Sequence, residues 1–278
     1  MVLRELTALR GVSGNEAAVR DYILERIRPL ADVRIDRMGN LIAHKKGTEG
    51  ARHVVLCAHM DEVGLMVTGI DDKGYLTYDT CGGIDPRVIV SKRVLVGEKA
   101  VPGVIGAKPI HLQSKSESVM KHDSLVIDIG AKDKADAERQ VNKGDFVSFD
   151  SEWVEFGAGM VKAKALDDRS GCAILMAILE NTYPCDITCA FTVQEEVGTR
   201  GAQTVMEHIE NVTCAIVLEG TTANDLGDVP EHLRVCAPGK GVAISMMDNS
   251  SLSHEPLWRA LRALARKEDI PWQMKSYV

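Results

Sequence analysis

The pattern of apolar and polar residues changes twice along this chain. Near the N-terminus, the S-x-x-E sequence at residues 13–16 has the form of a capping box, which predicts that a helix begins there. Apolar residues then recur at the spacing of one helical face, at Val19, Tyr22, Ile23 and Ile27. Short apolar runs at residues 41–43 and 53–58 follow, and each of them predicts a strand.

From about residue 64 to residue 156, the pattern changes to short β-like runs that Gly, Pro and Asp interrupt. These runs lie at residues 65–67, 75–77, 88–90, 94–96, 103–106, 125–127 and 146–148, with one helix-like piece at 134–141. Closely spaced short strands are typical of a small β-barrel or sandwich. We therefore predict a β-rich second domain in the middle of the chain.

After residue 159, strands and helices alternate again. We predict helices at residues 171–179, 201–209 and 257–265, and strands at residues 187–193, 214–218 and 241–246. Alternation on both sides of a β-rich insert predicts an α/β domain that is built from two separated halves. We expect this α/β domain at residues 1–65 and 157–278, with the inserted domain at residues 66–156.

The composition is that of a globular protein and excludes several classes. Of the 278 residues, 45% are hydrophobic and 26% are charged, and acids and bases are interspersed at a net charge of −7. The sequence has no basic footprint for nucleic acid, no visible signal peptide and no apolar stretch long enough to span a bilayer. Seven cysteines without a C-x-x-C pair favour a reducing compartment. We expect a cytoplasmic protein without a nucleic-acid or membrane partner.

Four clusters of acidic or histidine residues lie in the α/β part, and three of them directly follow an apolar strand. They are His59 with Asp61, Asp167 with Asp168, Glu195 with Glu196, and Glu219. In open α/β sheets, ligands bind beyond the carboxyl ends of the strands, where residues from distant parts of the sequence meet. One imidazole with several carboxylates suits zinc, cobalt or manganese. The four clusters together predict a metal site at this edge of the sheet.

Each cluster by itself has a simpler explanation. A histidine after a strand is usually a structural hydrogen-bonding residue, but Asp61 follows His59 by two positions, which is typical of a metal-binding imidazole with a carboxylate partner. The adjacent aspartates also fit a helix N-cap with an acid in the first turn. The adjacent glutamates and Glu219 fit solvated strand ends. The metal site is favoured because all four clusters lie at equivalent topological places.

A hydrolase can use this set of residues. Two divalent ions that one carboxylate bridges can share a water, lower its pKa and stabilise charge in a tetrahedral intermediate. A further carboxylate must stay off the ions to carry the proton. Two adjacent glutamates can divide the roles of ligand and proton carrier.

Three sequence blocks that carry these residues resemble the M42 metallo-aminopeptidases, a family often named glutamyl aminopeptidase and sometimes endoglucanase. The blocks are AHMDEVG at 58–64, KALDDRSG at 164–171 and QEEVGTRGA at 194–202, in the family's order and spacing. The similarity covers essentially the whole chain. It implies a mixed-sheet, zinc-peptidase-like catalytic α/β domain with an inserted PDZ-like β-barrel for dimerisation. It also implies a homo-oligomer of dimers that assembles into twelve-subunit shells.

The resemblance implies two divalent metal ions per subunit, zinc or cobalt, with manganese as a further candidate. The residues that would bind them are His59, Asp167, Glu196 and Glu219. Asp167 would bridge both ions. His59 and Glu219 would complete the first ion site, and Glu196 would bind the second ion.

The resemblance gives three more residues a place beside the ions. Asp61 would orient the ring of His59, and Glu195 would be the general base and acid. Asp168 would follow Asp167 across a strained peptide bond.

One departure from the family concerns its last metal ligand, a histidine well downstream of the segment IPWQMKSYV at 270–278. The seven histidines other than His59 do not match that motif, and we expect His254 at the N-terminus of the 257–265 helix. The site with Glu196 would then lack its third protein ligand. We expect that the sequence is a fragment, since it ends within a strand-like pattern at Tyr277 and Val278. A polypeptide that ended there would hold one ion weakly and turn over little.

The leading hypothesis is an aminopeptidase that removes N-terminal residues from short peptides with two metal ions. A catalytically impaired or non-enzymatic homologue is the alternative, because the last metal-binding histidine is missing. A glycoside hydrolase also uses paired carboxylates, but aromatic residues make up only 4% of the chain, which is few for a sugar cleft. The sequence indicates neither the preferred N-terminal residue nor the metal.

Overall fold

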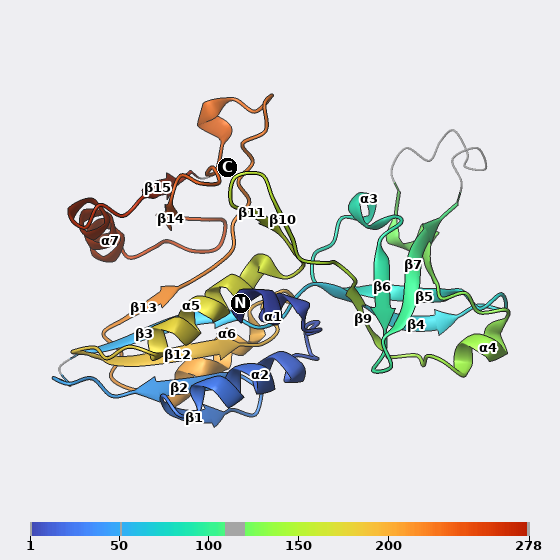
Figure 1. Ribbon diagram of the computed structural model, residues 1–278, viewed down its shortest axis with the longest axis horizontal. Helices are drawn as coiled ribbons and strands as arrows, with labels where there is room; N and C mark the ends of the chain where they lie inside the picture. Colours follow the sequence, from blue (N-terminus) through green and yellow to red (C-terminus); the bar gives the residue numbers. More distant parts are fainter. Residues whose placement is uncertain (1, 51, 109–119, 277–278) are drawn as a thin grey trace. The chain divides into compact units, whose positions relative to one another are not determined.

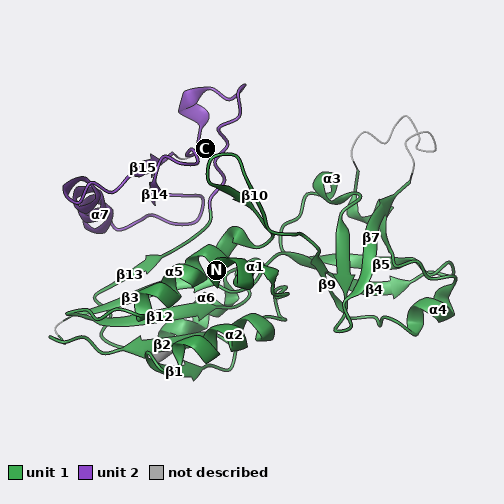
Figure 2. Cartoon of the chain, in the orientation of Figure 1, with its two compact units in different colours: residues 1–220 green, residues 221–278 purple. Residues whose placement is uncertain are grey.

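The computed structural model describes residues 2–50, 52–108 and 120–276 of the chain (Figure 1). They form two compact units, Met1–Gly220 and Thr221–Val278 (Figure 2). Unit 1 contains every residue of the predicted metal site. The architecture is mixed α/β, as predicted, and the site depends on how unit 1 is built.

A five-stranded mixed sheet is the frame of unit 1. Its strands lie in the order β1 (Asp32–Ile35), β2 (Leu41–Lys45), β12 (Asp186–Thr192), β3 (His53–His59) and β13 (Cys214–Val217). β3 lies between β12 and β13 and is parallel to both, whereas β2 pairs antiparallel with β12. Because β3, β12 and β13 run in one direction, the segments that follow them begin at the same edge of the sheet.

Alternating residues of the strands belong to different cores, as the twofold period of a strand requires. On one face, the strands share a core with helices α1 (Val2–Ala8), α2 (Ala17–Ile27) and α5 (Leu166–Leu179). On the other face, Ile42, Val55 and Ala190 pack with Val205 of helix α6 (Arg200–Val205). The predicted strands at 41–43 and 53–58 and the predicted helix after residue 16 are confirmed.

The predicted capping box is wrong. Helix α2 begins at Ala17, its N-cap is Glu16, and no side chain caps it. The side chains of Ser13 and Glu16 instead bond to residues outside the helix. The amphipathic pattern was sufficient to predict α2, because Val19, Ile23 and Ile27 are buried.

Six strands from the middle of the sequence of unit 1 form a closed barrel. Its strands are, in order, β4 (Gly64–Ile70), β5 (Leu76–Cys81), β8 (Leu125–Asp128), β7 (Val101–Ala107), β6 (Arg93–Val96) and β9 (Phe146–Phe149). The barrel has an apolar core of its own, which includes Leu65, Ile105 and Ile127. The predicted barrel is thus confirmed, whereas its PDZ-like character and its role in dimerisation stay predictions.

The helix predicted within the β-rich region is present as α4 (Lys134–Glu138), but the predicted strand at residues 88–90 is wrong. Residues Pro86–Ile89 form the short helix α3. Asp85 accepts the backbone N–H of Arg87, and Pro86 occupies the first turn. An N-cap aspartate followed by proline starts a helix, and this local signal outweighs the β-branched run.

The sequence patterns do not predict several short elements of the structure. They are α1, β1 and the hairpin of β10 (Val154–Phe156) and β11 (Met160–Lys162). The helix predicted at 201–209 ends as α6 at Val205 and continues as the 3-10 turn Met206–His208. The helix predicted at 171–179 begins earlier, as α5 at Leu166. The division into residues 1–65 with 157–278 and an insert at 66–156 stays a prediction.

Unit 2 contains a parallel strand pair with a helix between its strands in sequence. β14 (Val242–Ser245) pairs with β15 (Trp272–Lys275), and α7 (Glu255–Lys267) connects them. His254 is the N-cap residue of α7, as predicted. The strand-like end at Tyr277 and Val278 lies outside the described residues.

All seven cysteines lie in the described part of the chain and are free thiols. Within the described ranges, no helix combines the length and apolar character that crossing a membrane requires.

Candidate metal centre

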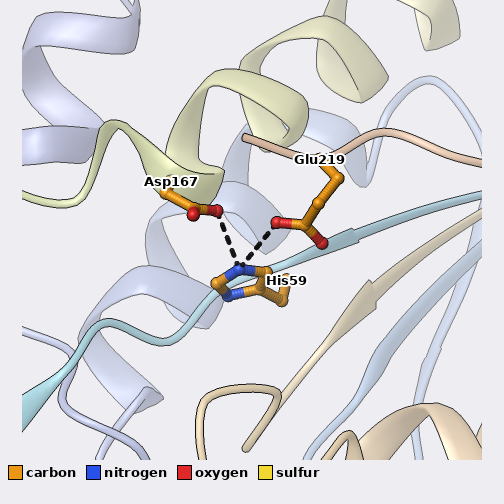
Figure 3. A group of neighbouring side chains, drawn as sticks. All are labelled: His59, Asp167 and Glu219. Atoms are coloured by element: carbon orange, nitrogen blue, oxygen red, sulfur yellow. Dashed lines mark hydrogen bonds and ion pairs between the residues drawn. The ribbon is translucent and has the colours of Figure 1, made fainter. Parts of the chain in front are cut away.

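His59 is the last residue of the central strand β3 and is only 2% exposed. Its Nε2 atom faces three carboxylates. The distances are 3.2 Å to Asp167 Oδ1, 3.4 Å to Glu219 Oε1 and 3.9 Å to Glu195 Oε2. Figure 3 shows how His59, Asp167 and Glu219 point toward one another, and one donor atom from each lies within 4.8 Å of the other two. The fold therefore brings together one residue from each of the four sequence clusters.

The other ring nitrogen of His59 faces Asp61. Nδ1 lies 3.1 Å from the backbone carbonyl oxygen of Asp61 and 3.4 Å from its Oδ1 atom. Both oxygens accept hydrogen bonds, so Nδ1 carries a hydrogen and the ring presents Nε2 to the carboxylates. Asp61 itself lies beyond the end of the strand and is fully buried.

The carboxylates around the ring decide its protonation. Burial lowers the pKa of His59, but hydrogen bonds with Asp167, Asp61 and Glu219 outweigh burial and raise that pKa far above its ordinary value. In return, the hydrogen bond with His59 lowers the pKa of Asp167 to about 2. The carboxylates therefore favour a positive charge beside Nε2, either a proton on that nitrogen or a cation in its place.

The two adjacent aspartates have different surroundings. Asp167 is largely exposed and faces His59, whereas Asp168 is 1% exposed. Asp168 accepts the backbone N–H of Gly171 at 3.0 Å and that of His59 at 3.2 Å. The peptide bond between the aspartates is cis, and the backbone of both departs from helical angles. Asp168 therefore accepts a backbone N–H in the first turn of the helix, as a capping residue does, whereas Asp167 faces the candidate site.

Glu195 and Glu196 project from the loop after β12. Their backbone N–H groups donate to Asp61, with distances of 2.9 Å from Glu195 to Oδ1 and 3.1 Å from Glu196 to Oδ2. Burial raises the pKa of both carboxyl groups, that of Glu196 to about 7, and the charge of Asp167 adds to each shift. Asp61 therefore holds both the ring of His59 and the backbone of this loop. Glu196 does not belong to the group of donor atoms within 4.8 Å.

Burial also shifts the pKa of two further carboxyl groups at the site. It raises the pKa of Asp168 to about 7, with the charge of Glu219 as the next cause. It raises the pKa of Glu219 as well, although the hydrogen bond with His59 opposes this shift. Acidic groups with raised pKa values around one imidazole are typical of functional sites.

The sequence patterns do not predict a buried ion-pair network that links the chain after β3 with the start of α5. Lys164 donates to both carboxylate oxygens of Glu62, at 2.7 and 2.8 Å, and Glu62 is 3% exposed. Arg169 is fully buried and donates to the backbone carbonyls of Met60 and Leu6 at 2.7 and 2.6 Å. These bonds join the chain after β3 to the start of α5, so they fix His59 relative to Asp167. Glu62 lies in the sequence block at 58–64, and Lys164 and Arg169 lie in the block at 164–171. These charged residues are the sequence feature that could have indicated the network.

The chain is similar to known peptidases over nearly its whole length. The family model of the M42 glutamyl aminopeptidases matches residues 39–278. The lysyl aminopeptidase of Pyrococcus furiosus is 31% identical to the chain over an alignment of 292 positions, which covers 99% of this chain and 80% of that protein.

Solved structures resemble the chain over nearly its whole length. An aminopeptidase of Desulfurococcus kamchatkensis has a TM-score of 0.94 at 32% identity and covers 99% of this chain, with 79% of that chain matched. The TET1 peptidase of Pyrococcus horikoshii, described as assembling into a tetrahedron or a large octahedral shell, has a TM-score of 0.85 at 36% identity. That match covers 99% of this chain and 83% of the other. A Thermotoga maritima structure named endoglucanase scores 0.84 at 35% identity, with 99% and 84% covered.

Proposed function

This chain belongs to the M42 glutamyl aminopeptidase family and is a peptidase, and from that premise we propose that it removes N-terminal residues from peptides with divalent metal ions. His59, Asp167 and Glu219, whose donor atoms lie within 4.8 Å of one another, would bind one ion. Asp167 with Glu196 would bind a second ion, as the resemblance to the family implies. Zinc or cobalt suits these ligands best, and manganese is acceptable to them.

The spacing of donor atoms at His59 carries the proposal. Zinc bonds of about 2.0–2.1 Å in tetrahedral geometry put neighbouring donor atoms roughly 3.3 Å apart. His59 Nε2 lies 3.2 Å from Asp167 Oδ1 and 3.4 Å from Glu219 Oε1. The residues therefore fit an ion that takes the place of the proton on Nε2. Three carboxylates around one imidazole leave an excess of negative charge, which a divalent cation would balance.

The proposed reaction uses the chain's residues for three tasks. Asp61 keeps the hydrogen of His59 on Nδ1, so that Nε2 remains a ligand. Bound divalent ions would supply Lewis acidity, which lowers the pKa of water and polarises the scissile carbonyl. Glu195 would take the proton from the attacking water and deliver it to the leaving amine. Burial raises the pKa of Glu195, and the charges of Asp61 and Asp167 add to this shift while that of His59 opposes it; a raised pKa suits a group that must accept a proton and deliver it again.

The substrate class follows from charge. The acidic residues at this edge of the sheet attract the free ammonium group of a peptide N-terminus. If the ammonium group is held beside the site of reaction, only the peptide bond that follows the first residue can reach it, which restricts cleavage to that residue. We propose short or unfolded peptides as substrates.

Three features of the whole protein belong to the same proposal. The α/β domain at residues 1–65 and 157–278 would carry out catalysis, and the barrel insert at 66–156 would make dimers that assemble further into a homo-oligomer. The similar TET1 peptidase, which is described as assembling into a tetrahedron or a large octahedral shell, supports this assembly. Seven free cysteines support a cytoplasmic location.

Glu195→Gln tests the proposed proton carrier. The amide is nearly isosteric but cannot take up a proton, so we expect kcat on aminoacyl p-nitroanilides to fall by about 10²–10⁴-fold. Metal content, measured by elemental analysis, should not change, because Glu195 is not a proposed ligand. Unchanged kcat in the variant would exclude the role of Glu195, and cleavage of cello-oligosaccharides in place of peptides would overturn the proposed function.

A further inference from the structure

The chain just before helix α2 is bonded to the candidate site. Ser13 is 6% exposed, and its hydroxyl donates to Asp61 Oδ2 at 2.7 Å. Its backbone N–H donates to the carbonyl of Glu62 at 3.2 Å, and the N–H of Glu62 donates to the carbonyl of Gly11 at 3.0 Å. Residues 11–13 therefore run beside the segment that follows β3, in a parallel bridge of Val12 with Glu62.

Three residues further on, Glu16 reaches the loop that carries the adjacent glutamates. Glu16 is 7% exposed, and its Oε1 atom accepts the backbone N–H of Gly14 at 2.7 Å and that of Gln194 at 3.1 Å. Gln194 has a φ of +54°, which is an uncommon backbone conformation for a residue other than glycine. The bond from Gln194 to Glu16 stabilises that conformation immediately before Glu195.

Three successive N–H groups of the loop thus donate to buried carboxylates. Gln194 donates to Glu16, and Glu195 and Glu196 donate to Asp61, which the hydroxyl of Ser13 holds in turn. Helix α2 does not need these side chains, because neither of them caps it. Burying a carboxylate is costly unless hydrogen bonds compensate it, so a role in the helix alone does not explain Glu16.

We propose that Ser13 and Glu16 are positioning residues of the peptidase site, which fix the backbone at Gln194, Glu195 and Glu196 from the turn before α2. This inference rests on the proposed function. Neither residue is among the proposed metal ligands. Both act through the loop, so that the Glu195 carboxylate stays directed toward Nε2 of His59, which lies 3.9 Å from its Oε2 atom.

Hydrogen exchange in the metal-free protein tests the inference without any need for activity. Ser13→Ala should speed exchange of the Glu195 and Glu196 amides by about tenfold, and Glu16→Ala should do the same for the Gln194 amide. Glu16→Gln keeps an oxygen acceptor and should restore protection, as Ser13→Thr should by its hydroxyl. NMR of the amides at 194–196 measures this effect.

The kinetic experiment separates positioning from stability. With zinc or cobalt added, Ser13→Ala and Glu16→Ala should lower kcat by about tenfold or more, with KM within about twofold and with metal content unchanged. Tyr22→Phe is the matched control, because it removes a hydroxyl of α2 that bonds to Glu5 on the surface. That variant should match the wild type in exchange at 194–196 and in kcat.

The outcomes distinguish this inference from the proposed function. Unchanged exchange at 194–196, or equal loss of protection along residues 17–27, would overturn the positioning role and leave a structural one. An inactive wild-type chain with metals added would overturn the proposed function, whereas the exchange experiment would still report whether Ser13 and Glu16 hold the loop. Full kcat in Ser13→Ala and Glu16→Ala despite faster exchange would also overturn the positioning role.

Discussion

At the scale of single residues, the chemistry of His59 is set by its neighbours on both sides of the ring. Asp61 fixes the hydrogen on Nδ1, and carboxylates surround Nε2. The same imidazole in a core without acids would be a neutral hydrogen-bonding group. Small residues matter equally, because the carboxylates need room. A β-carbon at Gly220 would lie 2.7 Å from Cγ of Asp167, which is too close for undisturbed contact.

Gly220→Ala should therefore displace the Asp167 carboxylate and weaken metal binding. We expect zinc affinity to fall by about 10–100-fold, as for other changes to residues that support metal ligands. Isothermal titration of the metal-free protein with zinc measures the effect. Gly83→Ala is the control, since a β-carbon there would meet no atom within 4 Å. Equal affinities of the two variants would show that Gly220 does not constrain the site.

At the scale of elements, helix α5 has two functions along its length. Its first residues supply Asp167 and Asp168 to the site, and its later residues pack into the core of unit 1. Leu175 is fully buried there, whereas the neighbouring Ile174 is 49% exposed. The packing of the later turns therefore fixes where the first turn presents its carboxylates.

Leu175→Ala should lower the free energy of unfolding by about 2–5 kcal/mol, because it removes buried methyl groups and leaves a cavity. Ile174→Ala on the same helix should cost less than about 1 kcal/mol, since its side chain is already half in water. Urea unfolding followed by circular dichroism measures both values. Similar losses for the two variants would contradict the packing of α5 described above.

At the scale of the whole chain, the site joins segments that are far apart in the sequence. Residues before α2, after β3, at the start of α5, after β12 and after β13 all contribute to it. An unfolded chain does not hold these carboxylates together, so a metal ion at the proposed site would bind the folded state selectively. The proposed metal binding would therefore be linked to stability.

Removing the metal ions should lower both activity and thermal stability. At a free ion concentration of about 100 times Kd, the bound ion stabilises the folded state by about 2.7 kcal/mol, which corresponds to roughly 5–10 °C in Tm. Differential scanning calorimetry before and after chelation, and after adding zinc or cobalt, measures the shift. A Tm and an activity that chelation leaves unchanged would contradict the proposed ion sites.

The residues that the sequence predicted correctly are those with strong local patterns. The 3.6-residue period of Val19, Ile23 and Ile27 predicted α2, and the apolar run at residues 53–58 predicted β3. The errors came where two local signals compete. Residues 13–16 match a capping box but bond elsewhere, and the β-branched run at 88–90 follows an aspartate and a proline that start a helix. In the first case, tertiary contacts of Ser13 and Glu16 outweigh the capping pattern. In the second case, the N-cap and the proline outweigh the β-branched run.

The sequence by itself determined the family, the alternation of elements and the residue types that a metal site requires, because periodicity and motif spacing are local properties of the chain. Only the tertiary structure decided which atoms meet. It directs Asp167 toward His59 and Asp168 toward backbone amides, although the two aspartates are adjacent. It also connects Ser13 to Asp61 across 48 positions. The spacing of residues along the sequence does not indicate these partners, because a hydrogen bond depends on the directions of its groups, which the packed strands and helices fix.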